Sequence, residues 1–298
     1  MNALVLMFTR WISHLGVFFM RAIAPLPLPV VRGMGWVLGR LLYVVVFSRR
    51  RIVMTNLSLC FPELPLPERR QLARKVVVRF AQSWLDRSWL WHGSRAQLAQ
   101  RLSVTGDVDA LKNEPRLVLF SPHFVGLDAG VMAVCMQNLR PLCSIYAKQK
   151  NAVVDAWILQ SRQRFEGHRL FPRHTGVREI TGFIEKGEAL YLLPDMDFGI
   201  HGAEFMPFMG VQAATVTSLS RFARLSRAHV ITLFNRMTPA GYEVNFSAPW
   251  DHFPTRDTTA DTALMNQKLA ALVRSAPEQY YWVHKRFKTR PPGEPSLY

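Results

Sequence analysis

The sequence predicts an α/β fold, with a mainly parallel mixed sheet flanked by helices and preceded by an apolar helical region that anchors the chain to a membrane. From about residue 116 onward, short apolar runs alternate with longer segments of helical periodicity, which is the pattern of strands joined by helices. Of the 298 residues 49% are hydrophobic, enough for a large core. The first 48 residues are very apolar. We therefore expect a membrane-associated helical region over residues 1–48 and an α/β domain over residues 49–298, in which residues 49–115 form a helical lead-in.

The N-terminal region has two apolar stretches, Met1–Ala24 and Gly33–Phe47. In the first, Arg10, His14 and Arg21 fall near one angle of a helical wheel, and a narrow basic stripe suits a helix that lies in a membrane interface. A spanning helix needs about 20 mostly apolar residues, and this stretch is long enough, but Arg10 and His14 would lie inside it. We expect an uncleaved anchor, and the sequence leaves open whether it spans the membrane or lies flat.

The helical lead-in begins with the basic run Ser48–Arg51, which fits either anionic headgroups or a solvated surface. Three prolines between residues 62 and 67 mark a turn, and Glu68–Trp91 then has the pattern of a long amphipathic helix. The α/β elements follow in order. Strands are expected over residues 117–120, 142–146, 189–193, 230–234 and 242–246, and helices over 127–136, 153–165, 176–186, 215–225 and 262–274.

The most informative stretch is the strand Leu117–Phe120 and the turn after it. Pro122 ends the strand, so His123 is expected at the sheet edge where open α/β proteins bind ligands, with Asp128 in the first turn of the next helix. A carboxylate that accepts from one ring nitrogen would leave the other to take a proton from a hydroxyl. This predicts a His/Asp general-base pair.

The alternative is that Asp128 only stabilises the helix N-terminus and that His123 is an ordinary turn residue. The spacing by itself does not decide, because His252 and Asp257 share it. That second pair lies in a polar loop interrupted by Pro254, so we expect no strand to deliver His252 to the sheet edge.

The segment from Pro122 to Asp128 resembles the HxxxxD motif of glycerolipid acyltransferases, and it is most similar to the bacterial lipid A late acyltransferase family, the lauroyl and myristoyl transferases. Further blocks occur in the order found in that family, so the resemblance extends from about Arg40 to Pro292. These blocks are Asn151–Asp155, Ser161–Arg164, Gly176–Arg178, Leu193–Gly199, Ala213–Thr217 and Pro277–Trp282. Met196 departs from the polar residue often found between the two aspartates of its block.

The resemblance implies an O-acyltransferase that moves a fatty acyl group from an acyl thioester to a lipid hydroxyl, without a cofactor or a metal. Because a histidine would be the base and the sequence has no GxSxG nucleophile elbow, we expect no acyl-enzyme. It implies acyl carrier protein as the donor, with acyl-CoA as the other choice, and a lipid A precursor of lipopolysaccharide biosynthesis as the acceptor. The enzyme would lie at the cytoplasmic face of the bacterial inner membrane. A lysophospholipid or an amino-acid-derived lipid is an alternative acceptor, and a basic membrane-binding protein without catalysis is an alternative of another class.

The resemblance also assigns roles to residues. His123 and Asp128 would be catalytic. Binding of the oxyanion or a phosphate would fall to the Gly126 backbone, Arg162 and Arg164, since a guanidinium fork binds phosphate in a bidentate manner. Asp195 and Asp197 follow a predicted strand and should lie at the same sheet edge as His123, where we expect a structural or substrate-positioning role. Arg178 is expected to position the substrate by binding a phosphate.

The charge of the chain favours a membrane partner. The formal net charge is +16, from 37 Lys and Arg against 21 Asp and Glu, and such an excess favours an anionic surface or a polyanion. Metal-finger spacings and aromatic RNA-binding signatures are missing from the sequence, which argues against nucleic acid. The three cysteines have no metal spacing and are expected to be small core residues in a reducing compartment. The basic C-terminal segment His284–Arg290 is expected to be a solvated end.

Overall fold

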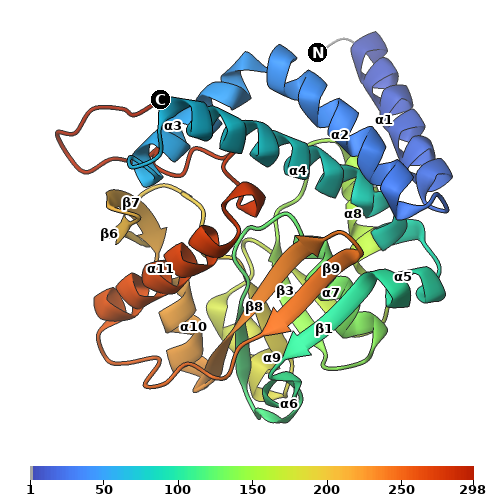
Figure 1. The fold of residues 1–298 in the computed structure, drawn as a ribbon. Helices are drawn as coiled ribbons and strands as arrows, with labels where there is room; N and C mark the ends of the chain where they lie inside the picture. The colour runs from blue at the N-terminus through green and yellow to red at the C-terminus, as the bar shows by residue number, and fades with distance from the viewer. Residues whose placement is uncertain (1–2) are drawn as a thin grey trace.

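A computed structural model describes residues 3–298, and its centre is a seven-stranded sheet (Figure 1). The strand order is β1-β9-β8-β2-β5-β3-β4, and every neighbouring pair is parallel except β8 and β9. This confirms the mainly parallel mixed sheet. The strands are β1 (Leu102–Gly106), β2 (Leu117–Phe120), β3 (Leu142–Tyr146), β4 (His168–Pro172), β5 (Ala189–Leu192), β8 (His229–Thr238) and β9 (Gly241–Phe246).

Both faces of the sheet are covered, which explains why β2 is a continuous apolar run. Leu117 and Leu119 join the core on one face, and Val118 and Phe120 join the core on the other, since successive side chains of a strand point to opposite faces. The first face is covered by α7 (Leu127–Met136) and α8 (Ala152–Arg162), and the second by α9 (Val177–Glu185), α10 (Ser218–Ser226) and α11 (Thr258–Ser275). The short helices α5 (Arg95–Arg101), α6 (Val108–Asn113) and η1 (Pro277–Gln279) complete this part of the chain.

The N-terminal helices form a layer beside the α/β part, at the top of Figure 1. They are α1 (Ala3–Ile23), α2 (Leu28–Val45), α3 (Phe47–Cys60) and α4 (Leu66–His92). Helix α2 packs along α4 at very close range, because a Cβ added at Gly35 would lie 2.7 Å from the Cα of Gln82, and one at Gly39 would lie 2.6 Å from the Cα of Val78. Among the described residues, α2 is the one helix long and apolar enough to cross a membrane by length and composition.

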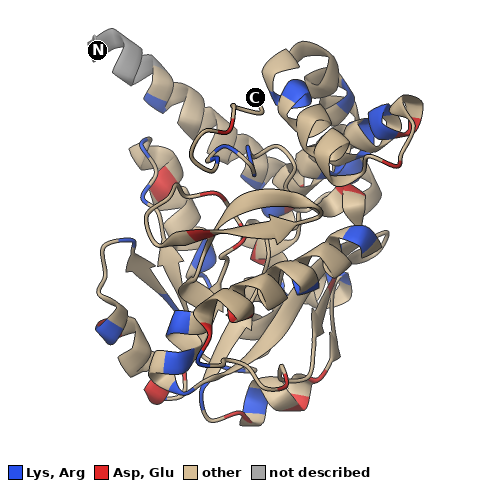
Figure 2. Ribbon diagram, turned by 90° about the vertical axis from the view of Figure 1, so that its left-hand side faces the viewer, with Lys and Arg blue, Asp and Glu red and all other residues tan. Residues whose placement is uncertain are grey.

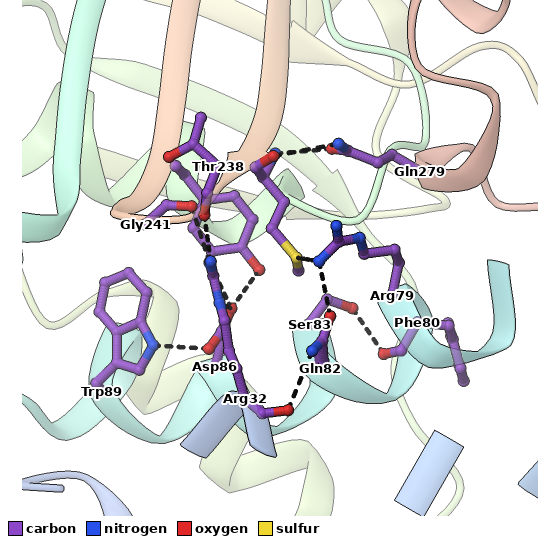
Figure 3. Close-up of polar contacts among 12 residues, drawn as sticks. Arg32, Arg79, Phe80, Gln82, Ser83, Asp86, Trp89, Thr238, Gly241 and Gln279 are labelled. Atoms are coloured by element: carbon purple, nitrogen blue, oxygen red, sulfur yellow. Dashed lines mark hydrogen bonds and ion pairs between the residues drawn. The ribbon is translucent and has the colours of Figure 1, made fainter. Parts of the chain in front are cut away.

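A buried ion pair fastens α2 to the rest of the molecule (Figure 3). Arg32 of α2 lies 3.2 Å from Asp86 of α4, and its guanidinium also donates to the carbonyl oxygens of Thr238 and Gly241 at the β8–β9 turn. Asp86 accepts further hydrogen bonds from the Trp89 indole (3.0 Å) and the Tyr242 hydroxyl (2.9 Å). A buried ion pair with this many partners holds α2, α4 and the β8–β9 turn in one arrangement, because removing either partner would leave a buried charge unpaired. One face of α2 is therefore committed to protein contacts.

The structure differs from the sequence-based expectation in several places, and β1 and β4 are strands that were not predicted. Residues 203–216 form an antiparallel hairpin, β6 (Ala203–Phe208) and β7 (Val211–Val216), so the helix expected from Thr215 begins only at Ser218. The expectation that the C-terminal segment is a solvated end is wrong for Arg286, which is 1% exposed and donates to the Ala214 carbonyl at 2.9 Å. Aromatic and aliphatic neighbours in this segment bury it against the hairpin despite its basic composition.

The cysteines are free and buried, as predicted for core residues, and burial raises the pKa of the Cys60, Cys135 and Cys143 thiols to about 12. Figure 2 shows that Lys and Arg are distributed over many helices and loops and outnumber Asp and Glu. The positive charge is thus a property of much of the surface and is not confined to the N-terminal region.

Candidate active site

The loop after β2 places His123 at the carboxyl edge of the sheet, as the sequence predicts. The segment after η1 holds this loop as an added short strand: Val125 donates its N–H to the Gln279 carbonyl, Tyr281 donates to the His123 carbonyl, and both distances are 3.0 Å. Phe124 and Tyr280 form an antiparallel bridge between these two bonds. The backbone around His123 is therefore fixed from a part of the chain more than 150 residues away.

The carboxylate that contacts His123 is Asp195. Its Oδ1 lies 2.7 Å from the Nδ1 of the His123 ring, and its Oδ2 accepts from the His123 backbone N–H at 2.9 Å. Burial alone would raise the pKa of Asp195, but the charge of the His123 ring and both hydrogen bonds outweigh burial and hold the pKa below its usual range. Asp195 is fully buried, whereas 21% of the His123 side chain is exposed. The ring is thus oriented from one side and open on the other.

The predicted contact between His123 and Asp128 is wrong. Asp128 is clamped between two guanidinium groups, with Arg87 Nε 2.9 Å from its Oδ2 and Arg162 Nε 2.9 Å from its Oδ1. Burial alone would raise the pKa of Asp128, but Arg162 and Arg87 outweigh burial and hold the pKa below its usual range. The carboxylate stays charged and positions two arginines at the same edge.

Strand register explains why Asp195 takes the place expected for Asp128. In the parallel pair of β2 and β5, Phe120 lies opposite Leu192. His123 and Asp195 each follow three residues later, so they leave neighbouring strands at the same level of one edge. This relation depends on which strands pair, and spacing within one segment cannot reveal it.

Arg87 is a site residue that sequence reasoning did not find. It lies on α4, and its guanidinium sits over the rings of Trp84 (4.5 Å) and Trp91 (5.5 Å). Among the described residues its buried Nη1 has no hydrogen-bond partner. An arginine on a long amphipathic helix resembles any surface arginine in sequence, so no local signal could have identified it.

The other predicted site residues are not all brought together. Arg162 reaches the site through Asp128, whereas Arg164 donates to the Leu90 and Gly93 carbonyls and caps the end of α4. Asp197 accepts from Thr289 (2.7 and 2.8 Å) and so fastens the C-terminal segment. These contacts give both residues structural roles, which was one of the two roles expected for Asp197 but was not predicted for Arg164.

Two more residues complete the predicted set. Gly126 precedes α7, and a Cβ there would lie 2.7 Å from the Tyr242 ring, so the turn requires glycine. Arg178 is exposed on α9. In residues 3–298 no group of three or more His, Cys, Asp or Glu side chains is placed to hold a metal ion.

The second pair with the same spacing behaves as the sequence indicates. His252 is exposed in a loop with a left-handed backbone (φ 52°). Asp257 caps α11 by accepting from the N–H groups of Thr259 and Ala260. The spacing therefore makes a site only where a strand presents it at the sheet edge.

Comparison with known proteins gives a consistent result along nearly the whole chain. The family model of the bacterial lipid A biosynthesis acyltransferases matches residues 2–289. The lipid A biosynthesis lauroyltransferase of Escherichia coli (strain K12) is 32% identical, over 97% of this chain and 95% of that protein. The lipid A biosynthesis palmitoleoyltransferase of the same organism is 30% identical, over 97% and 94%.

A solved structure was also found, that of a 1-acyl-sn-glycerophosphate acyltransferase from Thermotoga maritima, with a TM-score of 0.38 and 12% identity over 84% of this chain and 96% of that one. A likeness at that level carries no argument about activity. The match to the family model and the identity to the relatives, both over nearly the whole chain, show its class. The chain belongs to the bacterial lipid A biosynthesis acyltransferase family and is an acyltransferase.

Proposed function

We propose that this acyltransferase moves a fatty acyl group from an acyl thioester, with acyl carrier protein as the donor, to a hydroxyl of a lipid A precursor, and that His123 is the general base. The observation that carries the proposal is the pair of His123 and Asp195. Because Asp195 engages Nδ1 at 2.7 Å while the ring stays partly exposed, Nε2 is available to a substrate hydroxyl. The relatives are lipid A biosynthesis acyltransferases, which supports a lipid A precursor as the acceptor.

The reaction is a direct transfer. His123 takes the proton as the acceptor oxygen attacks the thioester carbonyl, and the tetrahedral oxyanion collapses as the carbon–sulfur bond breaks. The departing thiolate then receives the proton from the imidazolium, so the base is regenerated. A buried carboxylate at Nδ1 fixes the tautomer and stabilises the imidazolium.

Arg162 stabilises the negative charge of the tetrahedral oxyanion. Its Nε is bound to Asp128, and 29% of its side chain is exposed at the same edge, so its other N–H groups are free to face a ligand. Asp128 then acts through the arginines that it positions. Donors held in place before the reaction stabilise developing charge without reorganising, which is the usual basis of oxyanion stabilisation.

The proposed location is the cytoplasmic face of the bacterial inner membrane, with α1 and α2 lying in the interface. Both helices leave large apolar side chains exposed, and Arg32 together with the close contacts of Gly35 and Gly39 ties α2 to α4 along its other face. A helix held by protein on one side and apolar on the other suits an interfacial position. The exposed apolar residues are Trp11, Ile12, Leu15, Phe18 and Phe19 on α1, and Val30, Trp36, Val37, Leu41, Val44 and Val45 on α2.

The test is an acyl-transfer assay with the purified full chain in detergent, labelled acyl carrier protein or acyl-CoA, and a lipid A precursor. We expect the carrier-protein donor to be used and His123→Ala to lower the rate by about 10²–10⁴-fold, the range for a general base. The matched control His252→Ala should stay within about threefold of wild type. A folded His123→Ala enzyme with a normal rate would show that His123 is not the general base. A hydroxylamine-sensitive acylated protein, formed with donor alone, would overturn direct transfer.

A further inference from the structure

A groove of about 540 Å³ is lined by residues of α2, α4 and η1. Four of its lining residues are cationic and only one, Glu278, is acidic. The lining consists of Trp36, Arg40, Gln71, Arg74, Lys75, Val78, Arg79, Gln82 and Glu278. A concave site with this excess of positive charge is complementary to an anion.

The cations of the groove outnumber its one carboxylate and are not held in ion pairs by the described residues. Within residues 3–298, no ion pair includes Arg40, Arg74, Lys75 or Arg79. Like charges that share a groove repel one another, and an anionic ligand would relieve that repulsion. Arginine is the residue best suited to bind phosphate through two parallel N–H groups.

The wall of the groove is already fixed (Figure 3). Arg79 donates to the Oε1 of Gln82 at 3.0 Å, and the Gln82 amide donates to the Arg32 carbonyl at 3.0 Å. Arg32 is in turn held by Asp86. One cationic side chain is therefore positioned by the buried network, so binding a ligand there would cost less conformational entropy.

The groove opens beside the apolar face of α2. Trp36 and Arg40 lie one turn apart, with the guanidinium 4.7 Å from the ring centre, and both are exposed. Val37 and Leu41, the next residue after each, are about 60% and 58% exposed. Tryptophan and arginine with neighbouring exposed aliphatic side chains are typical of the boundary between acyl chains and headgroups.

The groove is separate from the catalytic edge. Its residues Gln71, Val78 and Gln82 lie on the face of α4 that meets α2, whereas Phe80 lies on the opposite face. The Phe80 ring packs 5.6 Å from Tyr281, whose ring is 6.1 Å from that of His123. The groove and the aromatic residues that lead to His123 thus lie on different faces of α4.

We propose that this groove binds the phosphomonoester headgroup of a membrane lipid, and that the bound lipid orients the enzyme on the membrane. Four cations suit the nearly two negative charges of a phosphomonoester better than the single charge of a phosphodiester. The acyl chains of the lipid would lie along the exposed face of α2. This site goes beyond the proposed acyl transfer and does not require it.

The test is equilibrium binding of dioctanoyl phosphatidic acid to the full chain in uncharged detergent micelles, measured by titration calorimetry. Arg74→Gln combined with Lys75→Gln should weaken binding by at least about tenfold, because two charge-assisted contacts are lost. Arg51→Gln combined with Arg70→Gln removes the same charge from exposed sites outside the groove, and should change binding by less than about threefold. Circular dichroism checks that each variant is folded.

Three further binding measurements test whether the ligand is a phosphomonoester lipid and whether it binds outside the catalytic site. Dioctanoyl phosphatidylglycerol should bind at least about tenfold more weakly, inorganic phosphate at the same concentration should not displace the lipid, and His123→Ala should bind like wild type. Equal weakening by both double variants, or equal affinity for both lipids, would mean diffuse surface charge and would overturn the proposal. Displacement by inorganic phosphate would overturn the lipid headgroup as ligand, and loss of binding in His123→Ala would place the lipid in the catalytic site. None of these outcomes depends on whether acyl transfer occurs.

Discussion

Two buried carboxylates stand at the edge of the sheet and face different partners. Asp195 contacts the histidine ring, and Asp128 contacts two arginines. Replacing each by asparagine keeps the shape but removes the charge, so the two changes should have different consequences. Asp195 orients the ring of His123, whereas Asp128 positions the guanidinium groups of Arg87 and Arg162.

We predict that Asp195→Asn lowers kcat by about 10²–10⁴-fold with modest loss of stability, because an amide can hold the imidazole in the wrong tautomer. Asp128→Asn should lower the free energy of unfolding by about 1–3 kcal/mol, because two charge-assisted hydrogen bonds from the partly exposed Arg87 and Arg162 to a buried carboxylate are weakened. The measurements are initial acyl-transfer rates and denaturant unfolding in the same detergent.

The matched control for both changes is Asp257→Asn. Asp257 follows a histidine by the same spacing but only caps a helix, where asparagine serves equally well. A normal rate for a folded Asp195→Asn enzyme would show that the ring does not depend on this carboxylate. If Asp128→Asn had the same free energy of unfolding as wild type, the charge of Asp128 would not be needed to hold Arg87 and Arg162 in the folded protein.

At the scale of elements, the contact of α2 with α4 decides which face of α2 stays exposed. Gly35 and Gly39 let the two helices approach until backbone meets backbone, and Arg32 adds a buried ion pair to the same face. Helix α2 has the length and composition of a spanning helix, but this face is used for packing on protein. One face of α2 is therefore packed on α4, and the other face, with its exposed apolar side chains, is the one that would contact lipid in the proposed location.

We predict that Gly39→Ala lowers the free energy of unfolding by about 1–3 kcal/mol, because the new methyl group would lie 2.6 Å from the Val78 Cα and the helices must move apart. Gly33→Ala on the same helix meets nothing within 4 Å, and it should be neutral or stabilising by up to about 1 kcal/mol, since alanine favours helix. Thermal unfolding in detergent compares the two. Equal effects would argue against close packing of α2 on α4.

At the scale of the whole molecule, charge and apolar surface act together. In the proposed location, the net charge of +16 would attract the chain to an anionic membrane, and the exposed faces of α1 and α2 would bury apolar area there. Salt screens only the first of these contributions. The chain should therefore stay with membranes in high salt and require detergent for release.

We predict that Val37→Glu combined with Leu41→Glu makes the chain extractable by high salt. Val177→Glu combined with Leu225→Glu adds the same charge at exposed apolar positions on α9 and α10, and should leave the chain resistant to salt. The measurement is the fraction in the membrane pellet after washes at rising salt concentration. Release of wild type by salt alone would contradict apolar anchoring, and release of both variants would place the anchor outside the α2 face.

The sequence by itself determined the class of fold, most of the strands and helices, and the position of His123 at the sheet edge. These follow from local features: the four-residue apolar run before Pro122, the alternation of strand and helix patterns, and the order of motifs along the chain. The strands β1 and β4 and the hairpin β6–β7 were not predicted. Ends of the sheet and small separate sheets have little of the double-sided burial that makes β2 recognisable.

Only the tertiary structure decided which carboxylate meets His123, which residues hold Asp128, and where Arg286 lies. Asp195 reaches the His123 ring because β5 pairs with β2 in a particular register. Arg87 reaches Asp128 because α4 lies beside the first turn of α7. Such contacts join residues tens of positions apart, and they are set by strand pairing and helix packing. The periodicity of one segment records which of its faces is buried, but it does not record which other segment covers that face.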